Sequence, residues 1–137
     1  MANLASLAVT PLYAGILALM LVFVSIRVTV ARVRLKVNIG DGGNLEMLQT
    51  MRAQGNLAEY APAAIILLGL LELGGTAPWL LHVLGLAFVV GRLMHAWVIS
   101  KTDVPRAGRA IGVTISWLVI AVSGVLSIAM TQGLVIR

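Results

Sequence analysis

The chain is dominated by long stretches without a charged residue. Three of them, residues 4–26, 73–91 and 110–136, each contain about the 20 residues that a helix needs to cross a hydrocarbon core of ~30 Å. Backbone polar groups in lipid must be satisfied within the segment itself, so each stretch is expected to be helical. The hydrophobic pattern therefore predicts at least three membrane-spanning helices.

A fourth uncharged stretch, residues 60–71, is too short to span the membrane alone, because a helix rises only ~1.5 Å per residue. The residues before it contain no strong helix breaker except Gly55. We therefore predict one helix over residues 45–73. Asn56 and Glu59 then lie inside the membrane with Arg52 at its edge, and polar groups there usually face a bundle interior or a cavity.

These elements predict an all-α membrane protein. We expect one four-helix transmembrane domain over residues 1–137, with helices at about 5–34, 45–73, 77–100 and 106–134. Charged residues make up 11% of the chain, against about 25% in a soluble domain. Basic residues gather around the first and third connections and are absent from the second, residues 74–78. Because basic loops stay cytoplasmic, both termini are expected on the outer side.

Charge and cysteine content exclude several functions. The net charge of +5 is explained by membrane topology, so no nucleic acid is expected as a partner. The chain has no cysteine, which rules out a disulfide, a thiolate metal site and a cysteine nucleophile. We expect no metal, and any reactive thiol must come from a ligand.

Polar residues of the second predicted helix form a cluster. Arg52, Asn56 and Glu59 are spaced i, i+4, i+7 and share one helix face, with Tyr60 one position around. Arg52 and Glu59 would either neutralise each other in a bundle core or bind a ligand. Ionisable groups inside a membrane are candidate functional groups, and the convergence of several types favours a site.

The third helix carries Arg92 and His95 on one face at i, i+3. A single histidine in a bundle is often only a core donor, and His82, in the other half of the helix, is interpreted as structural. Glu72 is expected to reach the outer membrane surface.

Two arginines, Arg106 and Arg109, open the fourth helix. Arg106 fits an orientation signal equally well, whereas Arg109 precedes 27 uncharged residues and is better placed to face the bundle. Arginine binds carboxylates with two hydrogen bonds, and beside a bound thiol it favours the nucleophilic thiolate. The site therefore suits a small ligand with several carboxylates, an amine and a thiol, and an acceptor that arrives from the bilayer.

The second helix carries a motif that resembles a known signature. Arg52, Asn56, Glu59, Tyr60 and Pro62 match R-x-x-x-N-x-x-E-Y-x-P of the MAPEG family, the membrane-associated proteins in eicosanoid and glutathione metabolism. Residues 91–95 and 109–112 also resemble bacterial members, and the similarity covers essentially the whole chain. It is greatest to the short inner-membrane members of bacteria.

The resemblance implies a homotrimer of four-helix protomers in the bacterial inner membrane. It implies glutathione as co-substrate, bound between adjacent protomers near the cytoplasmic face. Arg109 is favoured as the arginine that activates the thiol, with Arg106 as the alternative. The predicted glutathione-binding residues are Arg34 (with Arg32 as the alternative), Arg52, Gln54, Asn56, Glu59, Tyr60, Arg92 and His95.

The implied function is a glutathione transferase for lipophilic electrophiles, with peroxidase activity as a further option. The alternative is a non-catalytic scaffold that binds lipid or glutathione, as in one branch of the family. Some eukaryotic members place tyrosines on the third helix, where this chain has His95 and Ile99. A small drug-proton exporter is disfavoured because residues 4–26 lack the carboxylate that such proteins use.

Overall fold

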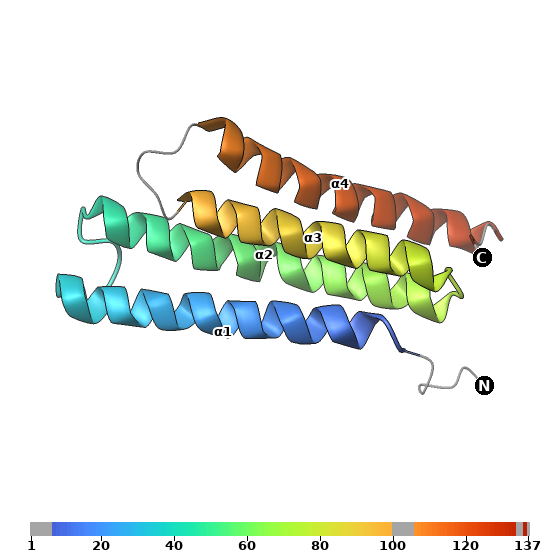
Figure 1. Ribbon diagram of the computed structural model, residues 1–137, viewed down its shortest axis with the longest axis horizontal. Helices are drawn as coiled ribbons and strands as arrows, with labels where there is room; N and C mark the ends of the chain where they lie inside the picture. Colours follow the sequence, from blue (N-terminus) through green and yellow to red (C-terminus); the bar gives the residue numbers. More distant parts are fainter. Residues whose placement is uncertain (1–6, 100–105, 134–135, 137) are drawn as a thin grey trace.

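The structure is a bundle of four helices. It is a computed structural model that describes residues 7–99, 106–133 and 136, and for residues 106–109 it describes the backbone alone. The helices are α1 (Thr10–Leu35), α2 (Leu45–Leu73), α3 (Pro78–Ile99) and α4 (Arg106–Thr131). They lie side by side along the long axis, and the start of α1, the α2–α3 connection and the end of α4 share one end (Figure 1).

Each helix contains a segment long and apolar enough to cross a membrane. This confirms the predicted all-α membrane bundle. It also confirms that the second helix extends back beyond the short uncharged stretch, since α2 runs from Leu45 through Arg52 and Pro62 to Leu73.

Local sequence explains where the helices begin. The side-chain oxygen of Asn44 accepts a hydrogen bond from the Met47 N–H at 3.1 Å, so Asn44 caps α2. α1 begins at Thr10, later than predicted, with Pro11 in the first turn, where its missing N–H costs nothing. The predicted limits at residues 100 and 134 lie outside the described residues.

Glu72 joins the end of α2 to the start of α1. Its carboxylate accepts hydrogen bonds from the backbone N–H groups of Ala8 at 2.6 Å and of Val9 and Thr10 at 2.7 Å. These donors have no partner within the helix. Glu72 therefore caps α1. The sequence predicted only that Glu72 reaches the outer membrane surface, not this role.

At the same end of the bundle, Tyr13 packs against α3. A Cβ atom on Gly85 would lie only 2.4 Å from the Tyr13 ring, so glycine permits this contact. The Tyr13 hydroxyl lies 3.0 Å from His82 Nδ1. This contact agrees with the structural interpretation of His82. It also means that Tyr13 has a partner at the end of the bundle away from the predicted site.

At the other end, α3 and α4 approach closely through Gly91 and Gly112. A Cβ atom on Gly112 would lie 2.8 Å from the Gly91 carbonyl oxygen and 2.9 Å from the His95 backbone nitrogen. Because both neighbours are backbone atoms, only glycine fits. This contact encloses the part of α3 that carries Arg92 and His95.

Candidate polar site around alpha 2

The outer face of α2 carries two exposed charges. We define this face by Leu48, Arg52, Glu59 and Ile66, all of which are exposed. Arg52 and Glu59 share it, as the spacing predicts, but within the described chain the side chain of neither forms a hydrogen bond or an ion pair with any residue. The interpretation in which they neutralise each other therefore does not describe this structure.

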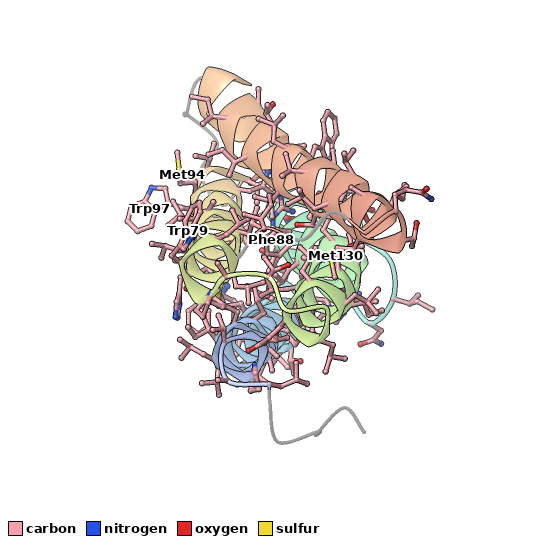
Figure 2. All side chains as sticks on the ribbon, turned by 90° about the vertical axis from the view of Figure 1, so that its right-hand side faces the viewer. Trp79, Phe88, Met94, Trp97 and Met130 are labelled. Carbon is pink, nitrogen blue, oxygen red and sulfur yellow. The ribbon has the colours of Figure 1, made fainter. Side chains whose placement is uncertain are left out.

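The depth of these charges follows from the outer face of α3, which we define by its exposed apolar residues. They are Trp79, Val83, Leu86, Val90, Leu93, Met94 and Trp97. Trp79 and Trp97 project on the same side of α3 (Figure 2). Their separation of 18 positions corresponds to ~27 Å along a helix, close to the hydrocarbon thickness, and tryptophan prefers the two membrane interfaces.

A contact between α2 and α3 shows how deep Glu59 lies in the membrane. The Asn56 carbonyl oxygen accepts from Arg92 at 3.5 Å, and Arg92 lies five positions inside Trp97. Arg52 is one turn from Asn56 toward the boundary, and Glu59 lies on the inner side of Asn56. The Glu59 carboxylate is therefore at hydrocarbon level and exposed, a position in which a charge needs a partner.

Asn56 lies beside these charges but is directed into the bundle. It is buried, and its side-chain N–H donates to the Arg52 carbonyl oxygen at 3.0 Å. Asn56 thus differs from its two neighbours on this face in being buried, whereas Arg52 and Glu59 are exposed. Gln54 and Tyr60 are half-buried.

Arg92 lies in the interior of the bundle, where it is 2% exposed and links three helices. Its Nε donates to Ser116 Oγ at 2.8 Å, and its Nη2 donates to the Gly112 carbonyl oxygen at 3.2 Å. Its guanidinium carbon lies 5.0 Å from the centre of the Tyr60 ring, a cation–π contact. These partners are all neutral, so the positive charge is held beside Tyr60.

His95 is also buried, 5% exposed, at the contact of α3 with Gly112 of α4. The structure therefore brings Arg92, Asn56 and Tyr60 together. It places His95 against Gly112 of α4.

The two candidate arginines of α1 have different surroundings. Arg32 donates to the Gly40 carbonyl oxygen at 3.0 Å and so holds the α1–α2 connection. Arg34 is exposed, forms an ion pair with Glu46, and lines a groove of ≈ 200 Å³ that also contains Thr50. Of the two, Arg34 is the one whose side chain is open to a ligand.

Arg106 and Arg109 occupy the first turn of α4, but their side chains lie outside what the structure describes. The choice between them as the thiol-activating arginine stays a prediction.

Sequence reasoning missed two residues of this region. Ser116 is fully buried against Arg92, and the Trp117 indole N–H donates to the Tyr60 hydroxyl at 3.1 Å. Ser116 lies one turn after Gly112, on the same helix face. Trp117 lies in mid-span, where tryptophan is less expected than at an interface. The sequence alone could therefore have drawn attention to both residues.

Comparison with known proteins supports the family resemblance. The model of the MAPEG family matches residues 10–129, which include parts of all four helices. The inner membrane protein YecN of Escherichia coli K12 is 40% identical over 87 residues, which cover 64% of this chain and 66% of that protein. YecN of E. coli O6:H1 gives the same values. The match thus spans just under two thirds of these relatives, and with four spanning helices the chain is a multi-pass protein of the inner membrane.

Proposed function

Because this chain belongs to the MAPEG family, we propose that it is a homotrimeric glutathione transferase that acts on lipophilic electrophiles. The observation that carries this proposal is the exposed pair of Arg52 and Glu59 on a membrane-spanning helix, without a partner in the described chain. Lipid cannot satisfy these charges. A ligand of opposite charges, enclosed by a neighbouring protomer, satisfies both.

Glutathione has the matching chemistry. It carries an ammonium group, two carboxylates and a thiol. Glu59 binds the ammonium group, and Arg52 binds a carboxylate with two hydrogen bonds. Arg34, which pairs with Glu46 at the groove between α1 and α2, would bind the second carboxylate by exchanging this partner for the ligand.

The reactive group is the glutathione thiolate. Arg109, or in its place Arg106, stabilises the thiolate from the first turn of α4, because a nearby positive charge favours the anionic form. Thiolate is the nucleophile, and the electrophile arrives from the bilayer beside the exposed apolar helices. In a peroxidase reaction two glutathione molecules would reduce a lipid hydroperoxide to an alcohol and water and would be joined as the disulfide.

The test is a thermal-shift titration of the detergent-solubilised protein with glutathione, combined with native mass measurement. We expect a trimer whose Tm rises with glutathione. Arg52→Ala and Glu59→Ala should lose this rise, whereas Lys36→Ala, which removes an exposed charge at the end of α1, should keep it. Arg109→Ala should keep binding but lose the thiolate ultraviolet signal, and Arg106→Ala distinguishes the two arginines. No Tm rise and no conjugation of a broad set of electrophiles would overturn the proposal.

One observation favours a second candidate, a non-catalytic scaffold that binds lipid or glutathione. The chain has two tyrosines, and Tyr13 is engaged by His82 at the other end of the bundle. Tyr60 is therefore the one phenol near the site, so thiol activation depends on arginine alone. A Tm rise without any conjugation would select this candidate.

A further inference from the structure

Tyr60 is held from two sides by residues of other helices. The indole N–H of Trp117 on α4 donates to the Tyr60 hydroxyl oxygen at 3.1 Å. Arg92 on α3 lies 5.0 Å from the centre of the Tyr60 ring. Indole N–H is a donor only, so the direction of the hydrogen bond is fixed and the phenol oxygen is its acceptor.

This arrangement leaves the phenol proton available. In the described part of the chain no residue accepts a hydrogen bond from the Tyr60 hydroxyl. A hydroxyl that accepts one hydrogen bond becomes a stronger donor of the next, because hydrogen bonds polarise one another. The Arg92 charge above the ring acts in the same direction, since it withdraws electron density from the phenol.

We propose that Trp117 is a positioning residue that orients the Tyr60 hydroxyl as a hydrogen-bond donor to an anionic group of bound glutathione. This inference rests on the proposed function. Tyr60 follows Glu59 directly and lies half-buried at the edge of the outer face of α2, where the ligand is proposed to bind. Trp117 is 55% exposed and donates to the Tyr60 hydroxyl, so we infer that it acts on the ligand through Tyr60.

The first measurement needs no ligand. The chain has three tryptophans, and ¹⁵N-tryptophan labelling gives one indole N–H resonance for each. We expect Tyr60→Phe to move the Trp117 indole resonance, because its hydrogen-bond acceptor is lost, and to leave that of Trp79 in place. An unmoved Trp117 resonance would overturn the inference, whether or not glutathione binds.

The second measurement tests the effect on glutathione. Trp117→Phe keeps an aromatic ring but removes the donor, and we expect about three- to tenfold weaker glutathione binding or thiolate formation. Trp79→Phe is the matched control, because Trp79 lies at the start of α3 and does not contact Tyr60. This variant should bind glutathione as the wild type does. In the Tyr60→Phe background, Trp117→Phe should have no further effect, because Trp117 acts through the phenol.

The outcomes separate the two proposals. If the wild type does not bind glutathione, the proposed function fails, and the indole resonance still reports on the Trp117–Tyr60 contact. If the wild type binds and Trp117→Phe changes nothing, the positioning role fails alone. S-methylglutathione identifies the acceptor, since Trp117→Phe should weaken its binding only if the phenol donates to a carboxylate and not to the thiolate.

Discussion

The outer faces of α2 and α3 are both exposed in the protomer, yet they differ in chemistry. The outer face of α3 is apolar and ends in Trp79 and Trp97 at a spacing that fits the hydrocarbon core. The outer face of α2 spans a similar depth but carries Arg52 and Glu59 among apolar residues. We therefore expect the uncharged exposed face to contact lipid, and we propose that the charged exposed face binds a ligand or another copy of the chain.

The largest effect is expected from a charge placed on the outer face of α3. Leu86 lies near the middle of this face and is 58% exposed. Leu86→Arg should weaken membrane insertion by about 2.5–3.5 kcal/mol, the usual penalty for arginine at a helix centre. The measurement is the membrane-integrated fraction together with Tm in nanodiscs, with Leu86→Met as control. Normal insertion of Leu86→Arg would show that this face contacts protein and would remove the contrast with α2.

The next effect concerns the α3–α4 contact, which fixes the direction in which the outer face of α3 points. Gly112→Ala would place a Cβ atom 2.8 Å from the Gly91 carbonyl oxygen. We expect it to lower the free energy of unfolding by about 1–3 kcal/mol, as overpacking does. Gly124→Ala, on the same helix in open space, is the control and should be neutral or slightly stabilising. Equal Tm values for the two variants would contradict the close contact.

The sequence sufficed to predict what depends on a single helix. Uncharged stretches located the four helices, and the spacing of Arg52 and Glu59 placed both on one face of α2. What it could not predict depends on pairs of helices. Glu72 caps residues more than 60 positions away, and Arg92 finds partners on both α2 and α4. Helical periodicity shows which residues share a face but not which faces meet.

The third prediction compares two glutamates of α2. Glu72 receives three backbone hydrogen bonds, so Glu72→Gln should cost about 1 kcal/mol of stability, as the loss of a helix cap does. Glu59→Gln removes a charge without a partner in the described chain and should leave the ligand-free protein at least as stable. Tm without glutathione measures both. A larger loss for Glu59→Gln would mean that another protomer already satisfies the carboxylate in the absence of ligand.

The smallest energetic effect, and the most direct test of the two faces, comes from the tryptophans. Substitution of Trp79 by phenylalanine should change stability by no more than about 0.5 kcal/mol, because its side chain is exposed on the apolar face. In variants that each retain a single tryptophan, lipids brominated near the headgroup should strongly quench the fluorescence of Trp79 and of Trp97. Trp117 is also exposed in the protomer, but it contacts Tyr60 at the edge of the outer face of α2. We therefore expect weaker quenching of Trp117 by bromine at every depth, since the proposed trimer covers this edge. Equal quenching of all three would place the edge in lipid, and the charges of α2 would then need a partner other than a neighbouring protomer.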